Sequence, residues 1–364
     1  MQRLALELLR PEMISAADVV EQGGRVLLRA GMAIQENHIQ VLQQLGFGSA
    51  YVVLPLCTAE PPKEILSREM RLGAVKAVRQ IYENFRDKGE ADGTPLRDLA
   101  KNMVNEVVVN RINLSQWVDL RTPDEYLPSH AVHVAMLSIL IGIKLEYNIT
   151  KLHEVAIGAL MLDVGEMSIP PEILQKKEKL TPAEMDTIRQ HSEKGFEAIR
   201  KKIRGIPATS AHVAYQHHEN FAGNGYPRGI SGAEIHEYAR IVSVADMFDA
   251  LVSDRPFRHY YLPNEAVGIL RALSGKLLDP EMVSALLQYV AVYPQGALVR
   301  LDTGEHGEVQ SVGAMNPSRP KLRLLTDKWD RPLREPDWID LEKQQNRFID
   351  KVLKDKELMK WITR

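Results

Sequence analysis

Histidine and acidic side chains are concentrated in the middle of this chain. The histidines of that region are His130, His133, His153, His191, His212, His217 and His218, and the acids near them include Asp163, Glu219, Asp246 and Asp249. Imidazole nitrogens and carboxylate oxygens together form ligand sets that iron, manganese and zinc accept in proteins. The chain therefore carries the side chains of a divalent metal site, provided that the fold brings them together.

The densest part of this region is the stretch "YQHHENFAGNGYPRG". Adjacent residues of a helix point about 100° apart, so His217 and His218 can face one pocket only if it lies between their two directions. Gly223 and Gly225 permit positive φ angles and Pro227 rigidifies the turn, which lets the backbone approach a ligand closely. Taken alone, adjacent histidines are more often a surface or packing feature, and "GNGYP" is only a tight turn.

Two more acids lie one helical turn apart in "RIVSVADMFDALVSDRPFR". An ionised carboxylate in such an apolar helix is costly unless it is paired or bound to a metal. Asp246 is therefore either a metal ligand or one half of a buried salt bridge, with Arg255 or Arg258 as the partner. For Asp249 the preferred interpretation is a hydrogen-bonding helix residue.

The elements expected around these residues are mainly helical. The region from about 118 to 290 has helical periodicity and little strand signal, while Gly23-Gly24 between two apolar runs predicts a hairpin near the N-terminus. Alternating apolar residues and glycine turns after residue 293 predict a small β module, and the tail reads as one more amphipathic helix. The predicted units are a small N-terminal α+β module at 1–58, a helical connector at 64–116, a helical domain at 117–291, a β module at 293–335 and a C-terminal helix at 336–364.

Length and composition limit the class of protein. A chain of 364 residues with 45% hydrophobic and 26% charged residues can build a large core in more than one unit. The net charge of −2 gives no global attraction to a nucleic acid polymer or an anionic membrane. The single cysteine, Cys57, excludes an internal disulfide. The first residues lack a signal-peptide pattern, and the longest apolar stretch, "AVHVAMLSILIGIKL", is too short to span a bilayer. We therefore expect a cytoplasmic protein.

Five motifs, in order, resemble the HD-GYP family, a branch of the HD superfamily of metal-dependent phosphohydrolases. They are "DEYLPSHAVHVAMLSILIG", "LMLDVGEMSIPPEILQKKEKLTPAE", "IRQHSEKGFEAI", "YQHHENFAGNGYPRGISGAEI" and "ARIVSVADMFDALVSDRPFR", which cover roughly residues 118–290. The resemblance implies a helical HD-type core. It also implies hydrolysis of cyclic di-GMP or a related cyclic dinucleotide with bound divalent transition metals, iron or manganese ahead of zinc.

The resemblance assigns roles residue by residue. The implied metal ligands are His130, Asp163, His191, His217, His218 and Asp246. Asp163 matches the aspartate of the family's His-Asp pair, which bridges two metals, and is the catalytic candidate. The implied substrate-binding residues are Gly225, Tyr226 and Pro227 of the GYP triplet and Arg228 beside it. His133, His153 and His212 match no family ligand, so we expect them to be satisfied helix histidines.

Four positions depart from the family pattern. Leu162 replaces the histidine of the His-Asp pair, and Glu166 stands where the family usually has a lysine. Ala222 stands where many members have aspartate, and Tyr126 stands where members with a third metal carry glutamate. One metal position keeps most of its ligands and the second keeps three, so one or two ions are expected. Glu166 replaces attraction to a phosphodiester with repulsion.

Two functions follow from this degenerate site. The first is a cyclic di-GMP phosphodiesterase of reduced or altered activity in second-messenger signalling. The second is a non-catalytic relative that binds a cyclic dinucleotide, a signalling protein or a second copy of itself. The surviving ligand positions favour the first function, and the loss of the histidine and the lysine favours the second.

Overall fold

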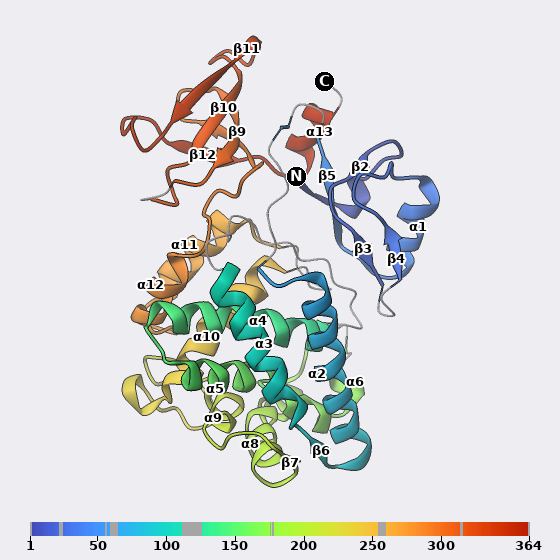
Figure 1. Ribbon diagram of the computed structural model, residues 1–364, viewed down its shortest axis with the longest axis vertical. Helices are drawn as coiled ribbons and strands as arrows, with labels where there is room; N and C mark the ends of the chain where they lie inside the picture. The colour runs from blue at the N-terminus through green and yellow to red at the C-terminus, as the bar shows by residue number, and fades with distance from the viewer. Residues whose placement is uncertain are drawn as a thin grey trace.

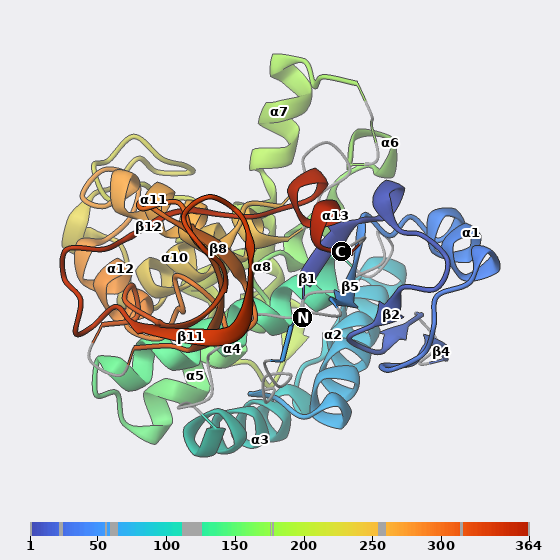
Figure 2. The ribbon, with the colours of Figure 1, turned by 90° about the horizontal axis from the view of Figure 1, so that it is seen from above.

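The computed structural model describes the chain in segments. These segments are residues 2–21, 25–54, 57–58, 65–110, 126–174, 176, 178–253, 260–313 and 316–362, with the backbone alone described at 126 and 362. The predicted mainly α fold is confirmed: helices form the body, and two smaller strand-containing modules lie side by side above it (Figures 1 and 2).

The N-terminal module combines short strands with one helix. Its elements are β1 (Gln2–Ala5), a 3-10 turn (Leu6–Leu8), β2 (Ile14–Ser15), β3 (Val19–Val20), β4 (Val26–Leu28), α1 (Glu36–Gln44) and β5 (Ser49–Val53). The strand order is β1-β5-β2, and β3 pairs with β4 in a separate antiparallel hairpin. The two strands of the predicted hairpin are therefore present, whereas its turn at Gly23-Gly24 lies outside the described residues.

The helical core holds most of the chain. Its longer helices are α2 (Arg68–Lys88), α3 (Pro95–Asn110), α4 (Tyr126–Lys144), α5 (Ile149–Leu160), α7 (Pro182–Arg189), α8 (His191–Lys201), α10 (Glu237–Val252), α11 (Pro263–Leu273) and α12 (Pro280–Leu287). Its shorter elements are β6 (Ala91–Asp92), η4 (Val164–Ser168), α6 (Pro171–Leu174), β7 (Ile203–Arg204), α9 (Ala211–Gln216) and η5 (Gly232–Glu234). One hydrophobic cluster joins them, and it includes residues of α2 and α3. The segment expected to be only a connector is therefore part of this core.

Helix α4 lies at the centre of the core, in contact with α2, α3, α5, α10 and α12. Leu127–Lys144 is the one window of the described residues that is apolar and long enough to cross a membrane by length and composition, and 83% of it is buried inside the protein. The expectation that this stretch is too short was wrong, because the helix has 19 residues. Its apolar residues belong to the hydrophobic core of the helical domain.

The C-terminal module is a five-stranded antiparallel sheet followed by a short helix. Its elements are β8 (Leu298–Leu301), β9 (His306–Ser311), β10 (Lys321–Thr326), β11 (Pro332–Asp340), β12 (Ile349–Val352) and α13 (Lys356–Ile362), with strand order β11-β10-β9-β8-β12. The predicted single helix at 336–364 is wrong over most of its length. Its apolar residues serve long-range strand pairing with β10 and β8, which helical periodicity does not detect, and only α13 is helical.

The two smaller modules share a hydrophobic cluster. Leu298, Leu353, Leu358 and Trp361 pack with N-terminal core residues such as Leu4, and α13 lies beside β1 and β5 (Figures 1 and 2). The backbone N–H of Ala5 also donates to Asp355 Oδ1 at 3.3 Å. The N-terminal strand thus packs with the C-terminal end of the described chain.

Candidate metal centre

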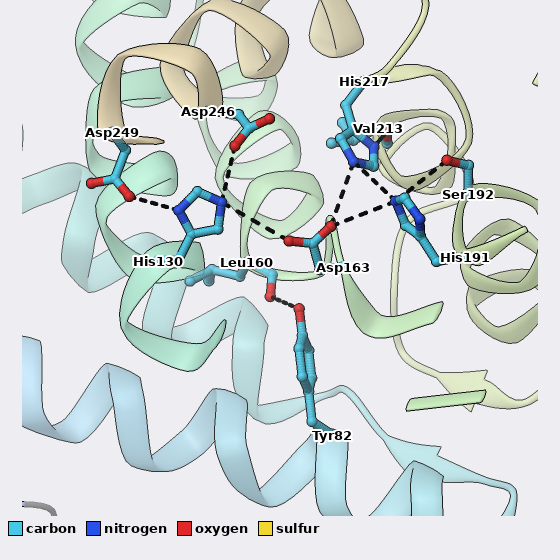
Figure 3. A network of polar contacts seen from close by, with 10 residues as sticks. All are labelled: Tyr82, His130, Leu160, Asp163, His191, Ser192, Val213, His217, Asp246 and Asp249. Atoms are coloured by element: carbon cyan, nitrogen blue, oxygen red, sulfur yellow. Dashed lines mark hydrogen bonds and ion pairs between the residues drawn. The ribbon is translucent and has the colours of Figure 1, made fainter. Parts of the chain in front are cut away.

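The six predicted ligands come from five different parts of the chain and meet in one buried site, which Figure 3 shows without His218. His130 is on α4, Asp163 lies between α5 and η4, His191 begins α8, and His217 and His218 follow α9. Asp246 is on α10. Only the packing of these helices brings the side chains together, since the ligands span more than a hundred positions of the chain.

The carboxylate of Asp163 faces two sets of imidazoles. Its Oδ1 lies 3.7 Å from His191 Nε2 and 3.5 Å from His217 Nε2. Its Oδ2 lies 3.9 Å from His130 Nε2, and that nitrogen is also 3.0 Å from Asp246 Oδ1. Each oxygen of Asp163 is therefore directed to a different group of candidate ligands, which is the arrangement of a carboxylate that can bridge two cations.

A donor set of the right kind is present on one side of Asp163. One ligand atom each from Asp163, His191, His217 and His218 lies within 4.8 Å of all the others. This mixture of nitrogen and oxygen donors fits a divalent transition metal. Among the described residues, these four side chains form the cluster of three or more His, Cys, Asp or Glu residues that could hold an ion.

The histidines are oriented by hydrogen bonds at their other ring nitrogen. Nδ1 of His191 lies 2.7 Å from the Ile188 carbonyl oxygen, and Nδ1 of His217 lies 2.9 Å from that of Val213. Since a carbonyl oxygen can only accept, Nδ1 carries the proton and Nε2 keeps its lone pair for a metal. The local turns before α8 and at the end of α9 therefore prepare these two rings as ligands.

His130 is oriented by a carboxylate in the same way. Its Nδ1 lies 2.6 Å from Asp249 Oδ2 (Figure 3). Nδ1 of His133 lies 3.5 Å from the other oxygen, Asp249 Oδ1. Asp249 is completely buried. The prediction that Asp249 is a hydrogen-bonding helix residue is confirmed, and so is that of a satisfied His133. Sequence reasoning missed that the partner of Asp249 is the ligand His130, although its place one turn after Asp246 on the same helix was a signal.

The electrostatics favour the protonation states that bind metals at Asp163, His191 and His218, but not at His217. Burial alone raises the pKa of Asp163, but the hydrogen bond and charge of His217, with the charges of His191 and His130, hold that pKa well below its usual range. Burial lowers the pKa of His191, and it lowers that of His218 to about 3, with the charge of His217 acting in the same direction. The pKa of His217 is raised, because Asp163 outweighs its burial. Cations are ligated by an ionised carboxylate and neutral imidazoles, so His217 releases its proton when a metal binds.

Glycines permit the close packing that the site requires. A Cβ on Gly165 would lie 2.0 Å from the backbone oxygen of His191 and 2.6 Å from the backbone nitrogen of Gly195, so only glycine lets η4 approach α8 this closely. A Cβ on Gly225 would lie 2.2 Å from the backbone nitrogen of Asn220. These contacts bring Asp163 to His191 and fold the GYP loop back on the end of α9.

The GYP loop covers the candidate ligands. The ring of Tyr226 stacks on that of His218 with centroids 4.8 Å apart, and its backbone N–H donates to the His218 carbonyl at 3.2 Å. The backbone N–H of Arg228 donates to Oε1 of the buried Glu219 at 2.7 Å. Pro227 follows a cis peptide bond. The structure thus brings Gly225, Tyr226 and Pro227 to the ligands, and it holds Arg228 by its backbone.

Tyr82 lies beside the candidate metal centre, although no sequence motif points to it. The Tyr82 side chain is buried on α2, and its hydroxyl donates to the Leu160 carbonyl oxygen at 3.2 Å, directly before the turn that carries Asp163 (Figure 3). Burial, followed by the charges of Asp163 and Glu166, raises the pKa of this hydroxyl. Because α2 is far from Asp163 along the chain, nothing in the local pattern predicts this contact.

The departures from the family pattern have distinct surroundings. Leu162 is 1% exposed and belongs to the apolar core, so it offers no ligand atom to the site. The side chain of Tyr126 and the arginines Arg255 and Arg258 lie outside the described residues. His153 and His212 were expected to be satisfied, but each has one buried ring nitrogen without a hydrogen-bond partner in the described part of the chain.

Comparison with known proteins agrees with this geometry. The model of the HD domain matches residues 112–282, and the model of a KOW domain associated with the HD domain matches residues 298–360. A cyclic di-GMP phosphodiesterase of Pseudomonas aeruginosa is 32% identical over 76% of this chain and 69% of that protein. A cyclic di-GMP phosphodiesterase of Thermotoga maritima is 37% identical over 48% of this chain and 46% of that protein, so the chain spans about half of the second relative.

A solved structure has the same fold. An HDG"Y"P protein from Bdellovibrio bacteriovorus superposes with a TM-score of 0.51 over 79% of this chain and 98% of that chain, at 19% identity. At this identity the likeness concerns the fold alone.

Proposed function

Because this chain belongs to the HD-GYP family of HD domain proteins, we propose that it is a metal-dependent cyclic dinucleotide phosphodiesterase with cyclic di-GMP as its substrate. The observation that carries this proposal is the placement of Asp163, whose two carboxylate oxygens face different groups of imidazoles. The names of the relatives support the substrate class, since they are cyclic di-GMP phosphodiesterases and, in Vibrio cholerae, 3'3'-cGAMP-specific phosphodiesterases.

We assign two metal positions to the site. The first is held by Asp163, His191, His217 and His218, whose ligand atoms already lie close together. The second is held by His130, Asp163 and Asp246, and it is weaker because Leu162 provides no ligand. Three protein ligands can still hold a divalent ion. We expect one or two ions, with iron or manganese preferred over zinc.

The residues of the chain prepare this site for phosphodiester hydrolysis. A bound divalent metal supplies Lewis-acid stabilisation of the charge that develops on the phosphoryl oxygens. Asp163, the catalytic residue of this proposal, would provide a carboxylate oxygen to each of the two metal positions. Gly225, Tyr226, Pro227 and Arg228 form the substrate-binding loop, in which the ring of Tyr226 stacks on His218.

A second function has its own observation. Leu162 is buried in the apolar core, and the charge of Glu166 acts on the Tyr226 hydroxyl. Both features oppose catalysis without disturbing the fold. In this alternative the protein is a cytoplasmic receptor for a cyclic dinucleotide, or a module that docks to a signalling protein or to a second copy of itself.

Metal analysis and product analysis on the same preparation test both functions. The protein is purified without oxygen after growth with iron and manganese, and its metal content is measured before cyclic di-GMP is added. The phosphodiesterase predicts at least one equivalent of metal and a linear dinucleotide or GMP that accumulates in proportion to protein. The receptor predicts binding of cyclic di-GMP without product.

Two variants make the test specific. His217→Ala removes a ligand from the better-supported metal position, so metal content and product formation should both fall. His38→Ala, in the N-terminal module, is the matched control and should change neither. A parent protein with less than about a tenth of an equivalent of metal, on the scale expected for a specific site, contradicts the phosphodiesterase.

A further inference from the structure

Tyr226 of the GYP loop lies between the candidate ligands and a cationic side chain. One contact of its ring is the stack on His218, and its edge meets His191 with centroids 6.3 Å apart. The guanidinium carbon of Arg189 lies 5.6 Å from the centre of the same ring. Arg189 is the last residue of α7, two positions before His191, so its guanidinium lies at the edge of the site.

Charges of opposite sign lie near the Tyr226 ring. Glu166 follows Gly165, where a Cβ would lie 2.0 Å from the backbone oxygen of His191, and Arg189 precedes His191 by two positions. Glu166 and Arg189 therefore lie on the two sides of the contact between η4 and α8. An anionic group placed beside this ring would be repelled by the first and attracted by the second.

The guanidinium of Arg189 is accessible. Its side chain is 52% exposed, and its ion-pair partner Asp186 is 70% exposed, with Nη1 and Oδ1 3.2 Å apart. Exposed pairs of this kind contribute little, so a phosphate oxygen can replace Asp186 as the partner at small cost. A guanidinium can donate two parallel hydrogen bonds to a phosphodiester.

Arg228, the arginine expected to bind phosphate, also acts on a histidine outside the candidate ligand set. After burial and Arg200, its charge is a cause of the lowered pKa of His212. The ring of His212 packs against those of Phe196 and His236. The guanidinium carbon of Arg189, by contrast, lies 5.6 Å from the centre of the Tyr226 ring. Arg189 is therefore the better-placed cation for a group bound beside Tyr226.

We propose that Arg189 is a substrate-binding residue that contacts a phosphodiester group of the cyclic dinucleotide beside Tyr226 and offsets the repulsion from Glu166. This assignment rests on the proposed function. It explains how the site can accept an anion although an acid occupies the position where the family usually has a lysine.

The first experiment measures binding and hydrolysis of cyclic di-GMP by the manganese-loaded protein of residues 1–364. Loss of a charge-assisted hydrogen bond predicts that Arg189→Ala weakens Kd, or raises KM, by about ten- to a hundredfold. If the parent hydrolyses the substrate, kcat should change less than KM, because the lost contact forms already in the bound state. Arg189→Lys should recover part of the loss.

Arg86→Ala is the matched control. Arg86 is 53% exposed and pairs with the exposed Asp87 at 2.8 Å, as Arg189 pairs with Asp186, but it lies on α2. This variant should leave Kd and KM unchanged. Thermal unfolding of both variants verifies that each is as well folded as the parent, since neither side chain is buried.

The second experiment repeats Arg189→Ala in a Glu166→Lys background. If Arg189 offsets Glu166, a lysine at 166 takes over part of its role, and the loss should shrink to less than about threefold. Equal losses in both backgrounds would overturn the compensation. If Arg189→Ala binds cyclic di-GMP as tightly as the parent does, the assignment is overturned but the proposed function is not. A parent that does not bind it would overturn both.

Discussion

Nδ1 of His130 lies 2.6 Å from Oδ2 of Asp249, a completely buried carboxylate that lies 119 positions later in the chain. A carboxylate in this position holds the imidazole with Nε2 turned toward Asp163 and Asp246, and it makes that nitrogen a better ligand. Asp249 therefore positions a metal ligand without being one.

We predict that Asp249→Ala weakens the affinity for manganese or iron about ten- to a hundredfold, the usual loss when such a partner is removed. Asp249→Asn should lose less, because its amide oxygen can still accept from Nδ1. Titration of the metal-free protein measures both affinities. Asp87→Asn, on the exposed end of α2, is the control, and an unchanged affinity in Asp249→Ala would contradict the positioning role.

A second prediction concerns the two central departures from the family pattern. Leu162→His combined with Glu166→Lys should increase metal content and phosphodiesterase activity, because the first change restores a ligand and the second restores a cation near the substrate phosphate. Elemental analysis and initial rates at saturating metal compare the double variant with the parent and with Glu166→Gln, which only removes the charge. If neither quantity rises, the site has diverged at further positions such as Ala222.

The close approach of η4 to α8 gives a third prediction. Gly165→Ala should lower the free energy of unfolding by about 2 kcal/mol or more, since the added methyl group meets backbone atoms that cannot move independently. It should also reduce metal content by moving His191 away from Asp163. Denaturant unfolding of the metal-free protein measures the first effect.

The control for this variant is another glycine. Gly268 lies within α11, and a Cβ there has no heavy atom within 4 Å, so Gly268→Ala should stabilise the protein by about 0.5–1 kcal/mol. If both substitutions had the same sign, the close packing at Gly165 would not be the cause of its effect.

A fourth prediction concerns pH. Burial lowers the pKa values of His212 and His236, whose rings stack with centroids 5.1 Å apart. The unfolded chain therefore binds protons at these histidines before the folded protein does. Stability is fully present above the unfolded value of about 6.5 and is lost as the pH falls below it.

Urea unfolding of the metal-free protein at pH values of about 7.5 and 5.5, on either side of the unfolded pKa, measures this loss. The double variant His212→Gln, His236→Asn should have a weaker dependence on pH, and asparagine can keep the N-terminal cap of α10 that His236 provides by accepting from Tyr238. Burial also lowers the pKa values of His191 and His218, so these two histidines still contribute to the pH dependence in the double variant. An unchanged slope would contradict the contribution of the stacked pair.

The sequence by itself determined the helical class of the core and the identity of the gathered side chains. Helical periodicity and capping are local, so the helices around Asp163 and Asp246 could be expected from nearby residues. The ordered motifs then identified six side chains that the structure does bring together. The C-terminal strands were missed because pairing of β12 with β8 joins segments distant in the chain, which leave no local pattern.

Only the tertiary structure decided how the gathered side chains are oriented. Asp163 directs one oxygen to His191 and His217 and the other to His130, which depends on the packing of α4, α8 and α9 around one turn. The contact of Tyr82 with Leu160 and the approach of Arg189 to Tyr226 likewise join elements that no spacing connects. The sequence states the residue types. The directions of the side chains and the distances between them arise when separate helices bury their apolar faces against each other.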